Sequence, residues 1–186
     1  MESSRTVADA ALAALAVRPA AAQEAAELAS LAEATFRESW QACNAPEDMD
    51  AYCEATVARG HVERDLATPG VQLLVAEAGG PLLGYLRWLP GGAAGIAGAR
   101  PAELSRLYAR RETHGRGVGP ALMRAFLRRA ASAGHDVAWL AVWQRAPQPI
   151  AFYRKWGFEI VGATTFQLGR DLQRDWLMQR ALGDVG

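Results

Sequence analysis

Apolar residues in the first third of the chain repeat at the spacing of an α-helix. The repeat predicts a helix over residues 20–40. A second helix is expected from Pro46, because proline is favoured in the first turn and acidic residues follow it. A short helical segment near residues 62–66 ends at a Thr-Pro-Gly turn. The residues that carry the first repeat are Ala25, Leu28, Leu31, Ala32 and Phe36.

Short apolar runs typical of β-strands follow these helices. Residues 71–78 and 82–89 are separated by Gly79-Gly80-Pro81, which predicts a β-hairpin. An earlier apolar run over residues 12–18 stops before a proline and predicts a first strand. Residues 90–101 are rich in glycine and proline, so we expect a loop there.

A strand, a helix and another strand are then predicted in succession. The β-prone residues 104–108 lead through a glycine cluster into a helix over residues 118–132, with Gly134 at the C′ position. Residues 137–143 carry no charge, as expected for a strand covered on both faces. This order predicts a parallel, right-handed crossover. The apolar stripe of the helix consists of Leu122, Met123, Phe126, Leu127 and Ala130.

The C-terminal part of the chain predicts one more helix and two strands. Pro149 is suited to start the helix and Gly157 to end it, after which residues 158–163 resume an extended pattern. A turn over residues 168–171 precedes a last strand over residues 175–182. Together the elements predict one α/β domain, with a mixed, mostly antiparallel sheet of six or seven strands flanked by helices.

Length and composition agree with a single domain. The chain has 186 residues and 51% hydrophobic content, which is enough for a packed core. We expect residues 1–10 to form a loose N-terminal leader and residues 11–186 to form the domain. No internal repeat indicates a second one.

Charge and cysteine content exclude several classes of partner. Twenty basic residues balance twenty acidic ones, so no overall field favours nucleic acid or an anionic membrane. No apolar run reaches the roughly 18 residues of a membrane span, and Asp9 interrupts the apolar residues 7–17, which argues against a signal peptide. Cys43 and Cys53 lack the spacing of a zinc site or disulfide framework, so we expect a cytoplasmic protein without a metal.

The glycine cluster between the central strand and helix is the strongest chemical signal. Gly115, Gly117 and Gly119 allow backbone N–H groups to converge on an anion at a helix N-terminus. A Walker loop is excluded because no lysine follows a glycine. A dinucleotide fingerprint is excluded because Pro120 stands where its third glycine is required. The cluster therefore predicts a pyrophosphate cradle of another type.

Two motifs resemble those of the GCN5-related N-acetyltransferases. Residues 114–119, His-Gly-Arg-Gly-Val-Gly, are similar to the acetyl-CoA-binding pattern Gln/Arg-x-x-Gly-x-Gly/Ala, with His114 at the first position. Residues 150–158 resemble a second signature, Phe-Tyr-x-Lys-x-Gly-Phe, although Ala146 and Pro149 replace an asparagine and an alanine. Segments 44–52 and 166–178 resemble the PaiA-type branch, which is linked to acetylation of polyamines and other small amines.

The resemblance implies a cosubstrate, acetyl-CoA, and the residues that bind it. It implies that the fourth strand separates from its neighbour, so that Leu107, Tyr108 and Ala109 hold the pantetheine arm and offer N–H groups to the oxyanion. It implies that the pyrophosphate lies on residues 114–120. The residues expected there are His114, Gly115, Arg116, Gly117, Val118, Gly119 and Pro120.

Acetyl transfer to an amine also needs groups that handle protons. An alkylammonium has a pKa about three units above neutral pH, so it must lose a proton before it attacks. Glu103 is the candidate that takes this proton through a water, and a solvated carboxylate at a strand end is the alternative. Tyr153 matches a tyrosine near the cofactor sulfur in the family, where it would stabilise the leaving thiolate; a packed helix tyrosine is the alternative.

The predicted function is direct transfer of an acetyl group to a primary amine of a small molecule, with a polyamine as one candidate. Acidic residues in the first half would attract a polycation, although a solvated helix face explains them equally. Protein N-terminal or lysine acetylation is the nearest alternative, and a CoA-binding sensor without turnover is another. Homodimerisation stays open.

Overall fold

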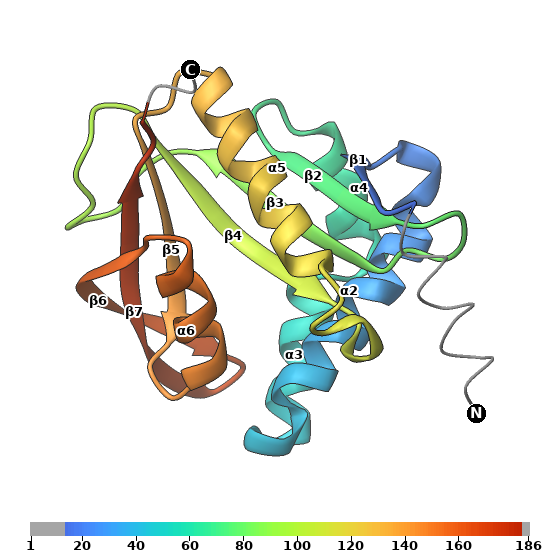
Figure 1. Ribbon diagram of the computed structural model, residues 1–186. Coiled ribbons are helices and arrows are strands. Elements are labelled where there is room, and N and C mark those ends of the chain that lie inside the picture. Colours follow the sequence, from blue (N-terminus) through green and yellow to red (C-terminus); the bar gives the residue numbers. More distant parts are fainter. Residues whose placement is uncertain (1–13, 184–186) are drawn as a thin grey trace.

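The computed structural model describes residues 14–183 and contains a seven-stranded mixed sheet in the order β1-β2-β3-β4-β5-β7-β6 (Figure 1). Neighbouring strands are antiparallel except β4 and β5, which are parallel. The predicted leader lies outside the described residues. The strands are β1 (Ala16–Pro19), β2 (Gln72–Glu77), β3 (Gly84–Pro90), β4 (Pro101–Ala109), β5 (Val137–Trp143), β6 (Glu159–Leu168) and β7 (Asp171–Ala181).

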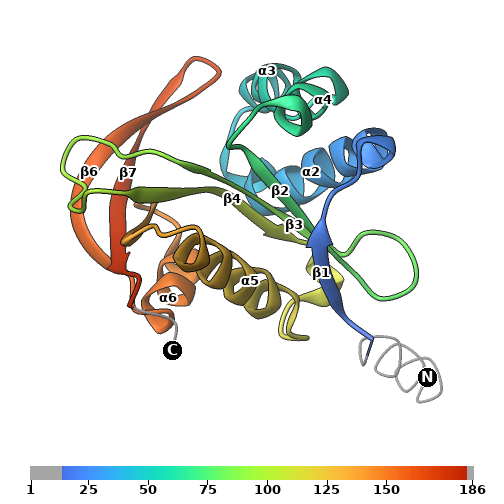
Figure 2. The ribbon, with the colours of Figure 1, turned by 90° about the horizontal axis from the view of Figure 1, so that it is seen from above.

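Helices cover both faces of this sheet. Figure 2 shows α2, α3 and α4 on one face, and α5 and α6 on the other. The connection from β4 through α5 to β5 is the predicted crossover between parallel strands. The helices are α2 (Ala25–Trp40), α3 (Pro46–Thr56), α4 (Arg59–Ala67), α5 (Val118–Ser132) and α6 (Pro147–Lys155).

The structure confirms the predicted sheet and corrects several boundaries. The bounds of α5 and β5 are as predicted, and the two C-terminal strands are longer than predicted. The helix expected from residue 20 begins at Ala25, after a 3-10 turn over Ala22–Glu24. The last helix begins at Pro147 rather than Pro149, because both prolines fit its first turn, where no N–H donor is needed.

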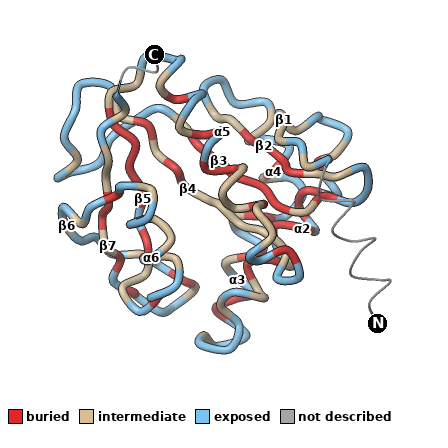
Figure 3. The backbone as a smooth tube through the Cα atoms, in the orientation of Figure 1, coloured by how far each residue is buried: buried red, intermediate tan, exposed pale blue. Residues whose placement is uncertain are grey.

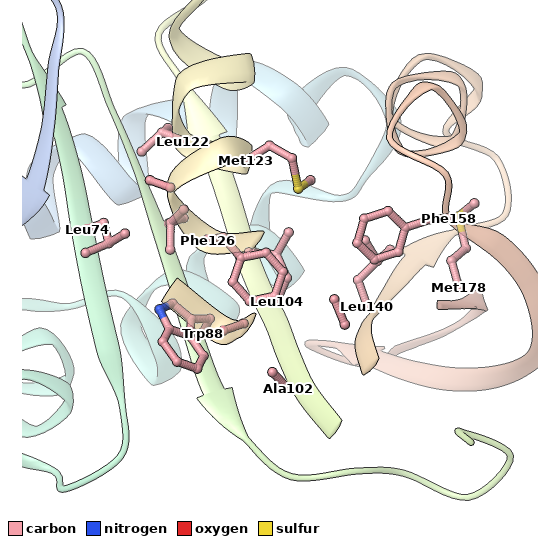
Figure 4. Close-up of a cluster of buried hydrophobic side chains, with 14 of the residues drawn as sticks. Leu74, Trp88, Ala102, Leu104, Leu122, Met123, Phe126, Leu140, Phe158 and Met178 are labelled. Atoms are coloured by element: carbon pink, nitrogen blue, oxygen red, sulfur yellow. The ribbon is translucent and has the colours of Figure 1, made fainter. Parts of the chain in front are cut away.

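Two groups of buried side chains hold the layers together. One packs between the sheet and α5 and α6, and the other packs between the sheet and α2, with buried residues following the central strands (Figure 3). Figure 4 shows the first group, in which α5 supplies Leu122, Met123 and Phe126 and the β5–β7 side supplies Leu140, Phe158 and Met178. The sheet is therefore fixed from both sides.

Gly84 allows α5 to approach the sheet closely. A Cβ atom at this position would lie 2.7 Å from the Tyr108 carbonyl oxygen and 3.0 Å from Cγ1 of Val118, the first residue of α5. Both distances are shorter than ordinary contacts. The start of α5 thus depends on the missing side chain of a residue in β3.

We predict that Gly84→Ala lowers the free energy of unfolding by about 1–3 kcal/mol, because the added methyl group forces β4 and α5 apart. Urea unfolding followed by circular dichroism measures the change. Gly80→Ala is the matched control, since a Cβ at Gly80, in the turn before β3, would meet nothing within 4 Å. Equal stability of the two variants would contradict the prediction.

Candidate active site

The parallel strands β4 and β5 separate soon after they begin. Their pairs run from Pro101–Val137 to Glu103–Trp139, although β4 continues to Ala109. Beyond that point β4 pairs with β3 alone, and β5 pairs with β7 (Figure 1). Among residues 14–183, no strand therefore pairs with this edge of β4 beyond Glu103.

Backbone alternation shows which groups of β4 face this opening. The Arg110 N–H donates to the Leu83 carbonyl oxygen at 2.9 Å, so it points toward β3. Because successive N–H groups of a strand point to opposite sides, those of Leu107 and Ala109 point toward the opening, while that of Tyr108 points toward β3. Two donors thus face the place where β5 has separated.

The loop from β4 to α5 continues this line of donors. Gly115 and Gly117 have φ values of +75° and +93°, and Gly117 is the N-cap of α5. A Cβ at either position would meet nothing within 4 Å, so glycine is needed for its conformation rather than for space. Within residues 14–183, four N–H groups here have no acceptor: those of Gly115, Gly117, Val118 and Gly119.

The other predicted residues of this loop contribute differently. Arg116 is half-buried and its N–H donates to the Thr113 carbonyl oxygen at 3.1 Å, while Pro120 has no N–H. The exposed His114 ring lies with Nε2 3.1 Å from the Ala109 carbonyl oxygen, so it contacts the open edge of β4. Four amides without acceptors at a helix N-terminus fit a pyrophosphate.

Helix α6 brings Tyr153 toward the same region. A Cβ at Gly119 would lie 3.7 Å from Cζ of Phe152, so α6 packs beside the start of α5. The Tyr153 ring packs edge-on against Phe152 and Phe158, and burial raises the pKa of its hydroxyl to about 12. Burial raises the pKa of the Tyr108 hydroxyl, and the nearby phenols of Tyr52, Tyr85 and Tyr153 add to the rise. Tyr153 is therefore protonated at neutral pH and can act as a donor.

Glu103 lies where the two strands begin to separate. It is half-buried, and burial raises the pKa of its carboxyl while Arg87 and Arg106 oppose this shift. Leu107 is four residues further along β4, about 13 Å at the usual rise of a strand. Glu103 is thus not adjacent to Leu107, and it could reach a reacting amine there only through water.

Trp40, which the sequence did not single out, bridges the opening on the α2 side. Its indole N–H donates to the Tyr108 hydroxyl at 3.1 Å, and its ring meets Trp143 of β5 edge-on at 5.8 Å between centroids. One side chain from the end of α2 therefore contacts both separated strands. Helical periodicity alone gives no sign of this, because the residue contacts strands far along the chain.

The turn between β6 and β7 is fixed against α3 on the same face. The Arg170 N–H donates to Oδ1 of Asp48 at 2.8 Å, and the Gln173 amide donates to Oδ1 of Asn44 at 2.6 Å. Gly169 has φ +55°, and a Cβ there would overlap Asp48. The hairpin and the start of α3 are thus joined across this face.

Metal ligands and membrane-spanning helices can be looked for in the described part of the chain. Between residues 14 and 183, no group of three His, Cys, Asp or Glu side chains is arranged to hold a metal ion. None of the helices in this range is long and apolar enough to cross a membrane.

Comparison with known proteins identifies the family. The family model for the acetyltransferase (GNAT) family matches residues 25–158. An uncharacterized N-acetyltransferase of Mycobacterium bovis is 34% identical over 159 residues, covering 86% of this chain and 98% of the relative. The L-methionine sulfoximine/L-methionine sulfone acetyltransferase of Pseudomonas aeruginosa is 33% identical over 115 residues, covering 60% of this chain and 63% of the relative.

A solved structure shows the same fold. The crystal structure of the PaiA N-acetyltransferase from Thermoplasma acidophilum, in complex with coenzyme A, superposes with a TM-score of 0.75. It is 18% identical, and the match covers 90% of this chain and 98% of that one. Separated parallel strands, a glycine-rich helix start and these matches agree with the motifs, and the chain belongs to the acetyltransferase (GNAT) family.

Proposed function

We propose that this N-acetyltransferase transfers the acetyl group of acetyl-CoA directly to the primary amine of a small molecule. The observation that carries the proposal is the separation of β4 from β5, which leaves the N–H groups of Leu107 and Ala109 without a strand partner. The open edge leads into the four free amides at the start of α5 and lies near Tyr153. A thioester arm and its pyrophosphate fit this arrangement.

Each group then has a role that its chemistry allows. The amides of residues 115, 117, 118 and 119 would hold the pyrophosphate, and those of Leu107 and Ala109 would stabilise negative charge on the acetyl oxygen. The amine nitrogen forms a bond to the acetyl carbon, the carbon–sulfur bond breaks, and sulfur keeps the electron pair. The neutral Tyr153 hydroxyl is suited to donate a hydrogen bond to this sulfur. Glu103 stays a proposed proton acceptor, acting through water.

A small acceptor is favoured over a polypeptide by the contacts of the β6–β7 turn. Its links to Asp48 and Asn44 close one side of the face on which an acceptor would lie. The Pseudomonas relative is named for two small molecules, which agrees with this preference.

A polyamine is less supported than a small amine in general. Several acidic residues that would attract a polycation have partners within the protein: Arg37 binds both Glu33 and Asp50, and Asp48 binds the β6–β7 turn. The Arg111 N–H donates to Glu38. The polyamine candidate therefore rests on the likeness to the PaiA branch.

A thiol-release assay with acetyl-CoA tests the function. We expect turnover with members of a panel of small primary amines, including spermidine, and slower turnover with peptides that carry a free N-terminus or a lysine. Turnover with peptides alone would favour the protein acetyltransferase. Calorimetric binding of acetyl-CoA without thiol release from any acceptor would favour the sensor.

We predict that Gly117→Ala weakens acetyl-CoA binding about tenfold, because an alanine in the left-handed conformation costs about 1–2 kcal/mol and turns the amides away from their common centre. Isothermal calorimetry measures the dissociation constant. Gly119→Ala is the matched control: its φ is ordinary and its Cβ would make an ordinary contact with Phe152. The prediction is wrong if both variants bind equally well.

We predict that Tyr153→Phe lowers turnover about tenfold or more, with little change in acetyl-CoA affinity, because the lost hydrogen bond to a charged sulfur is worth about 1.5–3 kcal/mol. Steady-state kinetics and calorimetry separate the two effects. Tyr85→Phe is the control, since it removes a buried hydroxyl that has no hydrogen-bond partner in the described structure. Near-wild-type turnover of Tyr153→Phe would assign this tyrosine to packing.

A further inference from the structure

Asp175 of β7 is a buried carboxylate without a partner on one of its oxygens. The residue is 7% exposed, and its Oδ1 atom has no hydrogen-bond donor within the described structure. Burial raises the pKa of its carboxyl to about 6. Burying a carboxylate in this way is costly, so an unpartnered one calls for an explanation beyond stability.

The sheet register fixes the neighbours of Asp175. It lies opposite Trp143 of β5 and opposite Thr164 of β6, so the three side chains share one face of the sheet. Gln173, two residues earlier in β7, points the same way and reaches Asn44 before α3. The shared face is therefore the one covered by α2 and α3. Thr164 is exposed and Trp143 is half-buried, so solvent comes within one side chain of the carboxylate.

The same register sets Asp175 level with the opening, one strand beyond β5. Glu103 and Trp139 form the last parallel pair, and four residues further along each strand stand Leu107 and Trp143. Asp175, opposite Trp143, is thus level with the part of β4 whose amides face the opening. Tyr153 belongs to α6. Figure 2 shows that α6 and α3 lie on opposite faces of the sheet. The acetyl donor, acetyl-CoA, and the acceptor amine would then meet between the two faces.

Within residues 14–183, no cation donates a hydrogen bond to the Oδ1 atom of Asp175. Arg174, its neighbour in β7, points to the opposite face by alternation. The Arg145 guanidinium lies over the Trp143 ring at 5.9 Å, and Asp171 accepts from the Gln173 amide. Burial is the cause of the raised carboxyl pKa, with no opposing contribution from a neighbouring cation. A ligand that brings a positive charge would supply what the fold does not.

We propose that Asp175 binds the ammonium group of the acceptor beside Trp143 and accepts its proton. The inference rests on the proposed function and names the group that recognises the amine. One N–H bond breaks, the electron pair stays on nitrogen, and an O–H bond forms on Asp175; the neutral amine is then ready to attack. Burial lowers the pKa of an ammonium and raises the pKa of a carboxyl, so the two pKa values move closer together. Because the Arg145 guanidinium already lies over the Trp143 ring, the carboxylate of Asp175 supplies the attraction to the ammonium.

A binding experiment tests recognition without requiring turnover. The probe is benzylamine, which is a cation at neutral pH, and benzyl alcohol is the neutral molecule of similar shape. With acetyl-CoA omitted, calorimetry should show about tenfold tighter binding of benzylamine than of benzyl alcohol, and Asp175→Asn should abolish the difference. The preference should also fade as the pH falls through about 6, where the carboxyl of Asp175 becomes protonated. Equal binding of the two probes by the wild type would overturn the proposal.

Kinetics then test the proton transfer. With an amine found in the thiol-release panel, Asp175→Asn should raise the KM for that amine about tenfold or more and remove the acidic limb of the kcat/KM profile, while Asp175→Glu should restore part of both. Acetyl-CoA affinity should stay within about twofold, since Asp175 lies on the acceptor side. If Glu103→Gln removes the acidic limb and Asp175→Asn does not, the proton goes to Glu103 and the proposal is overturned.

Two controls separate this proposal from a general loss of function. Glu159→Gln removes an exposed carboxylate from β6 and should change neither binding nor kinetics. Asp175→Asn should melt at a higher temperature than wild type at pH 8, because its folded-state carboxyl has a raised pKa and charging it weakens the fold as pH rises. A wild type that prefers benzylamine but acetylates no amine would contradict the proposed function while leaving the ammonium site intact.

Discussion

The structure depends on the point where β4 and β5 stop pairing. A parallel pair normally continues along both strands, because an unpaired backbone donor away from water costs free energy. Here the ladder ends after Glu103 and Trp139, and the remaining residues of β4 keep only one partner strand. The unpaired edge can be satisfied by a ligand that lies along it.

The two faces of the sheet carry different functional groups. On one face, α5 brings its free amides and α6 brings Tyr153, which suits the donor and its leaving sulfur. On the other face, Trp40 joins the separated strands and the β6–β7 turn is fixed to Asp48. Asp175 lies on this second face, where we propose that it binds the acceptor.

Glycines shape the face of the sheet on which we place acetyl-CoA. Gly84 removes a side chain that would separate β4 from α5, whereas Gly115 and Gly117 supply left-handed conformations in open space. The two uses of glycine are physically distinct: the first is a matter of volume and the second of backbone geometry. Both act on the same short segment, where the direction of a few N–H groups decides whether an anion can be held.

Local signals determined much of this protein. Periodicity and charge-free runs defined α5 and β5 to the residue, and the spacing of Gly115, Gly117 and Gly119 was enough to predict an anion cradle, because both depend on neighbours within one or two turns of chain. Helix starts next to prolines were less certain, since Pro147 and Pro149 both fit a first turn. The separation of β4 from β5 came into view only through resemblance.

Contacts between distant segments were decided by the tertiary structure alone. The sequence placed Trp40 at the end of a helix and Asp175 in one of the outer motifs. It could not show the partners of either residue, because the residues that lie opposite them come from distant parts of the chain. Strand register pairs Asp175 with Trp143 across more than thirty residues, and that pairing, together with burial, turns an ordinary aspartate into a carboxylate that lacks a partner. Sequence fixes local conformation through short-range sterics and periodicity, whereas the environment of a charge depends on everything that packs around it.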